Sequence, residues 1–327
     1  MSKIDRTVRR LADKARTVIP SEYAPSVLET EALSLENAFP EATADPSGCL
    51  TLDHRPPLSP LDVDRDATTR ALLAELRLVY GIGDRYTATL REDGYRSIPE
   101  LSAHPRWREA SSALLTDWGT PPDPGSVYRS LDRWLPSADP LHLRALGLLP
   151  VEGLLFFDLE TLGLGGSPVF LAAVGRFVDD GFLIRQYLAP SLDAEEALLE
   201  RTEAELRGAA ALLSYNGKSF DWTILRERFA YYGLPSPDAP IHVDLLHHAR
   251  RALGGGVPDC HLGTLEEHVL GIGRTNDLPS AEVPTYYTNY LETKDASHLV
   301  PIVNHSRQDL ASLVVLLKYL LWTAGDA

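Results

Sequence analysis

The feature that most limits the fold of this chain is a short apolar run that ends in two acids. Residues 154–157 are apolar, and Asp158, Leu159, Glu160 and Thr161 follow them directly. An apolar run of this length predicts a buried β-strand. Residues two apart on a strand project from the same face, so Asp158 and Glu160 point together. Two crowded carboxylates repel and need a cation or a shared proton, which indicates a metal site; the alternative is a chance pair of surface acids.

The pattern after residue 150 alternates between strands and helices. Strands are predicted at 169–178 and 182–188, with a turn between them, and a fourth strand at 211–215. Helices are predicted at 194–209 and 222–232, and an apolar helix at 310–321. Such alternation favours an α/β domain over 151–327, with a mixed sheet flanked by helices.

A second signal lies where the strand at 211–215 runs into a helix. Asn216 opens the turn, and Asp221 stands at the start of the helix. Asp221 is placed to turn its carboxylate toward Asp158 and Glu160, or alternatively only to cap the helix. Asn216 is expected to hold the turn or to bind a substrate group.

A third signal opens the late apolar helix. His305 and Asp309 are four residues apart, so a helix places them on one face. A histidine beside a metal-binding carboxylate can take a proton from an attacking water, because its pKa normally lies near neutrality. The alternative is a His–Asp pair on a helix surface.

Taken together in this order, the segments FFDLETLGLGG, LLSYNGKSFD and HSRQD resemble the three motifs of the DEDD, or DnaQ-like, 3′–5′ exonuclease superfamily. Within it the chain is most similar to the YprB-like branch. The resemblance covers about residues 151–322 and implies a ribonuclease H-like fold. It implies that Asp158, Glu160, Asp221 and Asp309 bind two divalent ions, Mg²⁺ or Mn²⁺, and that His305 is the general base. Hard carboxylate ligands suit these ions better than zinc.

The function implied by the resemblance is hydrolysis of phosphodiester bonds in DNA or RNA, by a two-metal mechanism and from single-stranded 3′ ends. Neighbouring motif positions are candidates for substrate contact: Thr161, Leu162, Gly163, Asn216, Lys218 and Arg307. Two alternatives stay open, a non-catalytic nucleic-acid-binding or scaffold protein that keeps the fold, and a structure-directed endonuclease.

The spacing of the third motif departs from one subgroup pattern. In the DEDDh subgroup the histidine sits five residues before the last aspartate, whereas here Asn304 holds that position. His305 sits four residues before Asp309, which is the spacing that the DEDDy subgroup uses for its tyrosine. The departure leaves the role of His305 open, while the four carboxylates keep their expected places.

The rest of the chain is expected to form three segments. Residues 1–65 are predicted as an N-terminal helix followed by an irregular linker. Residues 66–120 are predicted as a small helical module, in which Gly81-Ile82-Gly83 and its surroundings at 73–116 resemble a helix-hairpin-helix; a helical module without a ligand is the alternative. Residues 121–150 are rich in proline and are predicted as a linker.

Composition restricts the partners of the chain. The formal net charge of −15 disfavours broad electrostatic binding of nucleic acid, so an enzyme of this charge needs local basic groups or metal ions. No apolar run reaches the roughly 18–20 residues of a membrane span, so no membrane partner and a cytoplasmic location are expected. The sequence does not predict the oligomeric state.

Overall fold

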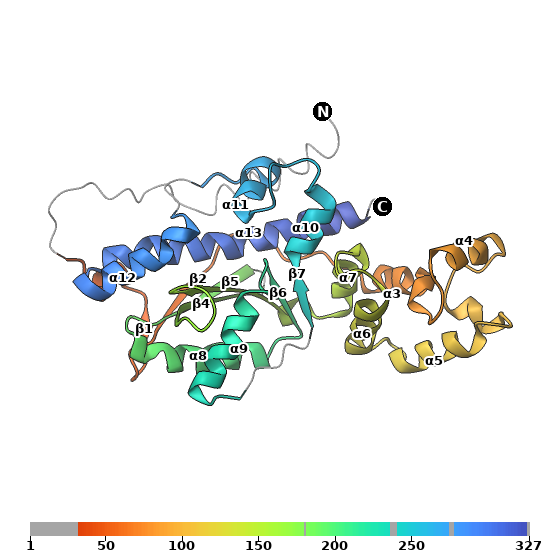
Figure 1. The fold of residues 1–327 in the computed structure, drawn as a ribbon, viewed down its shortest axis with the longest axis horizontal. Coiled ribbons are helices and arrows are strands. Elements are labelled where there is room, and N and C mark those ends of the chain that lie inside the picture. Colours follow the sequence, from red (N-terminus) through yellow and green to blue (C-terminus); the bar gives the residue numbers. More distant parts are fainter. Residues whose placement is uncertain (1–31, 180, 236–240, 275–277, 326–327) are drawn as a thin grey trace. The chain divides into compact units, whose positions relative to one another are not determined.

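The protein is described by a computed structural model that covers residues 32–179, 181–235, 241–274 and 278–325 (Figure 1). The helix expected within residues 1–20 lies outside these ranges. The chain divides into two compact units, one formed by Met1–Pro60 with Glu152–Tyr319 and the other by Leu61–Val151 with Leu320–Ala327. Within the described ranges, no helix combines the length and the apolar character needed to cross a membrane.

The first unit is built on a mixed β-sheet, as the sequence predicts. Its strands in the described ranges are β1 (Thr43–Ala44), β2 (Leu50–His54), β3 (Leu154–Thr161), β4 (Val169–Val178), β5 (Gly181–Leu188), β6 (Ala211–Ser214) and β7 (His242–Asp244). They lie in the order β1-β2-β5-β4-β3-β6-β7. The pairs on the β1 side of β3 are antiparallel, whereas β3–β6 and β6–β7 are parallel. The carboxyl ends of β3, β6 and β7 therefore meet at one edge of the sheet.

Helices cover both faces of this sheet (Figure 1). The helices α8 (Glu195–Arg207) and α9 (Asp221–Tyr232) pack on one face, and the long α13 (Leu299–Gly325) lies along the other. The other helices of the unit within the described ranges are α2 (Leu35–Ala38), α10 (Leu245–Leu253), α11 (Leu262–Leu265) and α12 (Val283–Thr293). Short single turns occur at Val151–Gly153, Leu192–Ala194, Glu266–Leu270, Ser280–Glu282 and Ala296–His298. The fold class predicted from the sequence is confirmed.

Strand β3 divides its side chains between the two faces. Leu155, Phe157 and Leu159 join the apolar core under α8 and α9. The alternate residues, which include Phe156, face the other way, and the Phe156 ring lies edge-on to the Phe182 ring at 5.5 Å between centroids. Because side chains alternate along a strand, Asp158 and Glu160 share the face of Phe156 and lie on the side of α13.

The second unit is helical. It contains α3 (Arg65–Ala74), α4 (Asp84–Glu92), α5 (Arg108–Trp118), α6 (Pro124–Trp134) and α7 (Pro140–Arg144), with short turns at Leu76–Leu78, Pro99–Ala103 and Ala145–Leu148. Its core includes the fully buried Leu72, Leu76, Ile98 and Trp118. Gly81 adopts a φ of 83°, and a Cβ atom there would lie 3.1 Å from the Trp107 ring, so the turn needs glycine for both its backbone and its packing. The resemblance of this turn to a helix-hairpin-helix stays a prediction.

Two segments expected to be linkers are structured instead. Residues 121–150 form α6 and α7, with Val127 and Leu131 fully buried. Pro124 and Pro140 are the first residues of these helices and follow the capping residues Asp123 and Asp139. Proline is favoured at that position because its missing N–H costs nothing there. In the segment 1–65, β2 pairs with β5 and so belongs to the main sheet.

A buried ion pair fixes the loop that follows β3. Arg228 on α9 donates to both oxygens of Glu195 on α8, at 2.8 and 2.6 Å, and both side chains are buried. Arg228 also donates to the carbonyl oxygen of Gly166 at 3.0 Å, and Glu195 accepts from the backbone N–H of Val169 at 2.8 Å. The pair therefore ties two helices to the loop at 162–168.

Arg228→Ala should lower the free energy of unfolding by about 3–5 kcal/mol, because it leaves the Glu195 carboxylate buried without its cation. Urea denaturation measures this change. Arg207→Ala is the matched control, since Arg207 pairs with Glu203 on the exposed surface of α8 and such pairs contribute at most about 1 kcal/mol. Equal losses of unfolding free energy in the two variants would show that the buried pair contributes no more to stability than the exposed pair.

Candidate functional site

The first two predicted carboxylates lie where β3 outruns its parallel neighbour. The last residue pair between β3 and β6 joins Phe156 to Leu213, so Asp158 and Glu160 extend past the end of β6. On the other side β3 stays paired with β4, and the register shifts between Glu160 and Thr161. Asp158 and Glu160 are thus held by one rigid strand, with open space at its parallel edge for groups from other elements.

Asp221 is brought to β3 by the loop between β6 and α9. It is the first residue of α9, and the residue before it, Phe220, makes no side-chain capping bond. The Asp221 carboxyl lies near its own backbone N–H and the N–H of Leu159 on β3, which lower its pKa against the larger effect of burial. Asp221 is therefore buried against the strand that carries Asp158, and a role as a simple N-cap does not describe it.

The loop that delivers Asp221 is shaped by Gly217 and Asp244. A Cβ atom at Gly217 would lie 2.5 Å from the Ser214 side chain and 3.0 Å from Oδ2 of Asp221, so only glycine fits there. Asp244, at the end of β7, accepts from the backbone N–H groups of Asn216 at 2.8 Å and Lys218 at 3.2 Å. It also caps α10 through Leu246. Asp244 therefore supports this loop as well as capping a helix.

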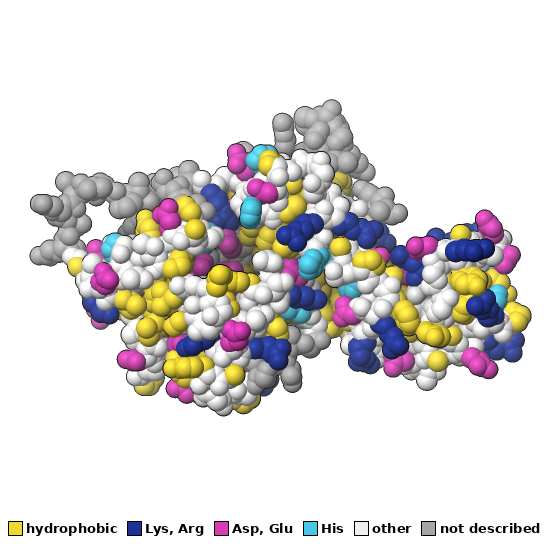
Figure 2. All heavy atoms as spheres, viewed as in Figure 1, with side chains coloured by type: hydrophobic (Ala, Val, Ile, Leu, Met, Phe, Trp, Pro, Cys, Tyr) yellow, Lys and Arg dark blue, Asp and Glu magenta, His cyan; other side chains and the backbone are white. Residues whose placement is uncertain are grey.

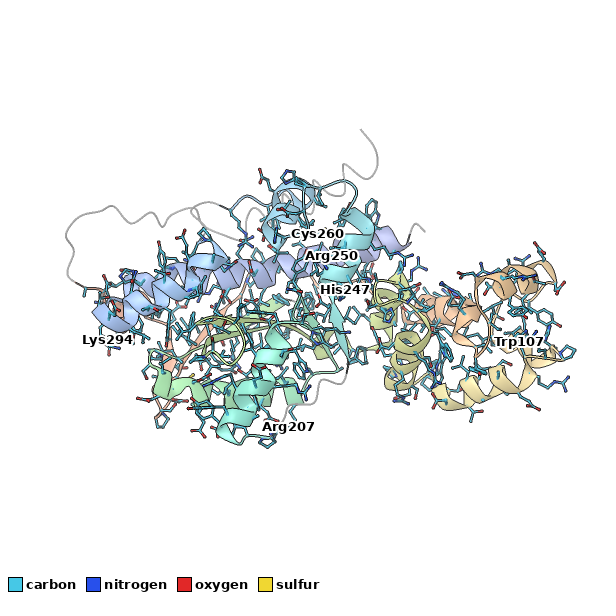
Figure 3. The ribbon with its side chains drawn as sticks, viewed as in Figure 1. Trp107, Arg207, His247, Arg250, Cys260 and Lys294 are labelled. Carbon is cyan, nitrogen blue, oxygen red and sulfur yellow. The ribbon has the colours of Figure 1, made fainter. Side chains whose placement is uncertain are left out.

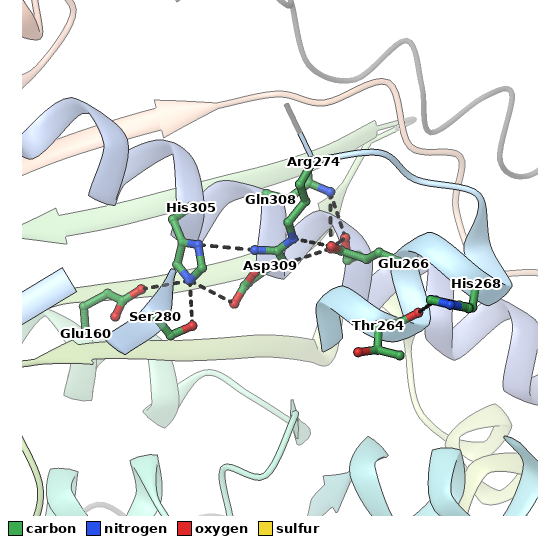
Figure 4. A network of polar contacts seen from close by, with 10 residues as sticks. Glu160, Thr264, Glu266, His268, Arg274, Ser280, His305, Gln308 and Asp309 are labelled. Carbon is green, nitrogen blue, oxygen red and sulfur yellow. Dashed lines mark hydrogen bonds and ion pairs between the residues drawn. The ribbon is translucent and has the colours of Figure 1, made fainter. Parts of the chain in front are cut away.

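The third motif reaches the site from α13. His305 is buried, and its Nε2 atom lies 3.7 Å from Oδ2 of Asp309 and 4.0 Å from Oε1 of Glu160 (Figure 4). Oγ of Ser280 lies 3.3 Å from the same Nε2 atom. The predicted i, i+4 arrangement therefore places His305 and Asp309 against the acids of β3.

Electrostatics links the four carboxylates. Burial raises the pKa of Asp158 well above its usual range, and the negative charges of Glu160, Asp309 and Asp221 raise it further. Burial is also the main reason that the pKa of Asp221 rises to about 7. Acidic side chains gather in a hollow on the face of the first unit that Figure 2 shows. These shifts show that the negative charges lie close enough to repel one another, and that the charge of Arg274, which lowers the pKa of Asp158, offsets only part of the effect.

Two charged residues at this site were not predicted from the sequence. Arg274 donates to Oδ1 of Asp309 and to both oxygens of Glu266, and its Nη1 lies 3.2 Å from Nδ1 of His305 (Figure 4). Glu266 is completely buried and also accepts from Ser312 and Gln308. No motif marks these residues, because their contacts join a turn at 266–270 to α13 across the fold.

The arginine also fixes the state of the histidine ring. An arginine side chain has donors and no acceptor, so Nδ1 of His305 must accept from Nη1 of Arg274. A neutral His305 then carries its proton on Nε2, the nitrogen that faces Glu160 and Asp309. In this arrangement His305 is a hydrogen-bond donor toward the carboxylates, and it can accept a proton there only after its bond to Arg274 is released.

The oxygen ligands that these carboxylates offer are of the kind that a hard divalent cation prefers. Four carboxylates meet, and Oδ2 of Asp158 is buried without a hydrogen-bond partner among the described residues. In this conformation no group of three or more His, Cys, Asp or Glu side chains within the described ranges is arranged to hold an ion. Asp309 instead forms an ion pair with the guanidinium of Arg274. The carboxylates would supply the ligands of such an ion, and Asp309 could do so only after its release from Arg274.

The other predicted substrate contacts divide between the site and its surroundings. Thr161 ends β3, and Leu162 and Gly163 open the loop after it. The Thr161 hydroxyl donates to the Gly163 carbonyl at 2.6 Å, and the Leu162 N–H donates to the Pro168 carbonyl at 3.1 Å. Lys218 is exposed on the loop before α9. Asn216 adopts a φ of 61° and holds the turn.

Arg307 lies away from the carboxylates. Its Nε donates to Oε1 of Gln186 on β5 at 2.8 Å, and its charge lowers the pKa of His54 on β2, after the larger effect of burial. Arg307 therefore helps to attach α13 to the sheet. Another basic residue of the unit is Arg250, which is exposed and lies on α10, as His247 does (Figure 3).

Comparison with known proteins identifies the class. A profile of the RNase_H superfamily matches residues 155–321, which is half of the chain and contains all three motifs. The chain therefore belongs to the RNase_H superfamily.

Two individual similarities accompany this match. The uncharacterized protein YprB of Bacillus subtilis (strain 168) is 34% identical over 170 residues, which are 50% of this chain and 41% of YprB. The chain thus matches less than half the length of that relative, and the predicted similarity to the YprB-like branch is confirmed. Among solved structures, E. coli Exonuclease I in complex with a dT13 oligonucleotide aligns at 18% identity over 46% of this chain and 42% of the other, with a TM-score of 0.29.

Asp158→Asn should stabilise the metal-free protein at pH 8 by about 1–2 kcal/mol, because it removes a buried charge that its neighbours repel. Thermal unfolding in chelator measures the change. Added Mn²⁺ should then raise the Tm of the unsubstituted protein by mass action but leave the variant unmoved. Glu200→Gln, on an exposed position of α8, is the control. A variant less stable than the unsubstituted protein in chelator would contradict the argument.

Proposed function

We propose that this protein is a divalent-metal-dependent nuclease that hydrolyses phosphodiester bonds in DNA or RNA, as a 3′–5′ exonuclease. The observation that carries the proposal is the convergence of Glu160, Asp221 and Asp309 on the buried carboxylate of Asp158, whose Oδ2 has no hydrogen-bond partner among the described residues. These residues come from three stretches far apart in the sequence. Membership of the RNase_H superfamily supports the same reading.

The chemistry divides between the ions and the chain. Two Mg²⁺ or Mn²⁺ ions would supply the charge that activates the attacking water and stabilises the leaving oxygen. Asp158, Glu160, Asp221 and Asp309 would hold them. Strand β3 fixes the first two carboxylates, and the Leu159 N–H and the tight turn at Gly217 fix Asp221. Such fixed groups need little rearrangement during the reaction, which is the main source of electrostatic catalysis.

His305 is proposed as the group that handles the proton of the attacking water. Its Nε2 atom already faces Glu160 and Asp309, so it stands beside the reaction centre. To accept a proton there, the ring must carry its other proton on Nδ1, and the bond from Arg274 must open. This requirement makes the function of His305 depend on the position of one arginine.

A non-catalytic scaffold is the weaker alternative. Burying Asp158 among three other acids lowers stability, and a protein that only binds or assembles gains nothing from that cost. A structure-directed endonuclease would use the same carboxylates, so the site geometry favours neither kind of nuclease. The proposal of end-directed cutting from the 3′ side rests on the motif resemblance, and digestion of labelled strands decides it.

Asp158→Asn and Asp309→Asn should each lower Mg²⁺- or Mn²⁺-dependent hydrolysis by at least about 100-fold, since each removes a charged ligand from the centre. Single-stranded and duplex DNA and RNA, labelled at the 5′ end and digested with and without Mn²⁺, provide the measurement. A ladder that shortens stepwise from the 3′ end indicates exonuclease action, whereas early internal fragments indicate an endonuclease. Glu200→Gln is again the control. Undiminished hydrolysis in either aspartate variant would refute the assignment.

His305→Gln should lower kcat by about 10²–10⁴-fold, the usual range for loss of a proton-transfer group. Glutamine keeps polar atoms in the buried pocket but cannot take up a proton at neutral pH. The affinity for Mn²⁺, measured by calorimetry, should change little. If Mn²⁺ binding and kcat fell together by the same factor, His305 would be a metal ligand instead.

A further inference from the structure

An arginine stands at the carboxylate site and is held there by an acid that the proposed chemistry does not use. The Arg274 side chain is 15% exposed, and that of Glu266 is completely buried. The Nε and Nη2 atoms of Arg274 donate to the two oxygens of Glu266, with 2.9 Å between Nη2 and Oε1. Glu266 is held in turn by the Ser312 hydroxyl and by Nε2 of Gln308 (Figure 4).

The planar guanidinium presents two edges, and they face different partners. The edge formed by Nε and Nη2 is taken up by Glu266. The outer edge, formed by Nη1 and Nη2, faces His305 and Asp309. Glu266 therefore fixes the plane of the group, and the plane directs two N–H donors at the residues of the proposed reaction centre.

The burial of this pair needs an explanation beyond stability. Replacing a buried ion pair by apolar side chains of similar volume is often neutral or stabilising, so the Glu266–Arg274 pair is a poor means of filling the core. Glu266 takes up the edge formed by Nε and Nη2 and leaves the outer edge of Arg274 to His305 and Asp309. Such an arrangement is typical of a side chain that is held in place to bind a ligand.

We propose that Arg274 is a further substrate-binding residue, whose outer edge binds two non-bridging oxygens of the phosphodiester, with Glu266 as its positioning residue. This inference rests on the proposed function. Asp309 now occupies the outer edge at Nη2 and His305 at Nη1, but a metal ion would need the carboxylate of Asp309. Once Asp309 is engaged by an ion, the anion that the reaction brings to this point is the substrate phosphate. A guanidinium edge matches two phosphate oxygens in spacing and charge.

The test is binding of a fluorescently labelled single-stranded oligonucleotide, followed by anisotropy in Ca²⁺ under conditions in which a gel shows no cleavage. Arg274→Gln should weaken binding by about tenfold or more, as expected for loss of a hydrogen-bonded charge. The slope of log affinity against log salt should fall by about 0.7, the value for one phosphate contact on a single strand. Arg226→Gln, an exposed arginine on α9, is the matched control and should change neither value.

Neutral linkages locate the contact. A series of oligonucleotides, each with one methylphosphonate in place of a phosphodiester, removes one negative charge at a time. At the linkage that Arg274 binds, the methylphosphonate and Arg274→Gln should weaken binding by the same factor, and the combination by no more than either alone. Additive effects at every linkage would overturn the proposal.

Two further variants separate binding from folding. Arg274→Gln leaves Glu266 without its cation, so Arg274→Gln with Glu266→Gln provides a variant without that buried charge, and its loss of affinity should be the same. Arg274→Lys keeps the charge but loses the planar fork, and should recover only part of the affinity. Normal oligonucleotide binding by either glutamine variant would overturn the proposal.

Metal binding provides the remaining control. Calorimetry with Mn²⁺ alone should show that Arg274→Gln binds the ion at least as tightly as the unsubstituted protein, because the guanidinium no longer occupies Asp309. A loss of Mn²⁺ affinity equal to the loss of oligonucleotide affinity would place the effect at the metal site and overturn the proposal. Failure of the proposed function differs from this outcome: there the unsubstituted protein hydrolyses no strand with Mg²⁺ or Mn²⁺.

Discussion

Repulsion between carboxylates at the carboxyl edge of the sheet is the constraint on which the rest of this structure depends. Strand β3 carries Asp158 past the end of β6, while α9 and α13 bring Asp221 and Asp309 to it. Contacts outside the carboxylate cluster fix these elements: the apolar face of β3 lies on α8 and α9, and Gln186 on β5 donates to the backbone carbonyl of Val303 on α13. The apolar core therefore stabilises an arrangement that the acids alone would disperse.

The positive charge of Arg274 offsets only part of this repulsion. Glu266 pairs with it and Asp309 shares it, so its single charge is already matched before Asp158, Glu160 and Asp221 are considered. Burial and the three neighbouring acids raise the pKa of Asp158, and the opposing effect of the Arg274 charge is the smallest of these. The site therefore needs more positive charge than the described side chains supply. That deficit is the physical argument for divalent cations.

The sequence allowed the parts that depend on local geometry to be predicted. Alternation along β3 and the helical spacing of His305 and Asp309 follow from fixed periods, and the structure has both. The same reasoning misplaced Arg307, because a residue two positions after His305 lies about 200° around the helix and faces β5. Arg274 and Glu266 could not be found in this way, since their contacts join segments that only tertiary packing brings together. Proline misled the interpretation of 121–150, where it begins helices instead of interrupting them.

One edge of one side chain connects the proposed ligand, the proposed base and the proposed substrate. The outer edge of Arg274 now bonds Asp309 through Nη2 and His305 through Nη1. An anion that takes this edge releases both groups together. Asp309 would then have an oxygen for a metal ion, and Nδ1 of His305 could carry the proton that lets Nε2 act as an acceptor. The phosphate therefore competes with Asp309 and His305 for the same pair of N–H donors on Arg274. Under this proposal, binding of the phosphate and release of the proposed ligand and base are coupled.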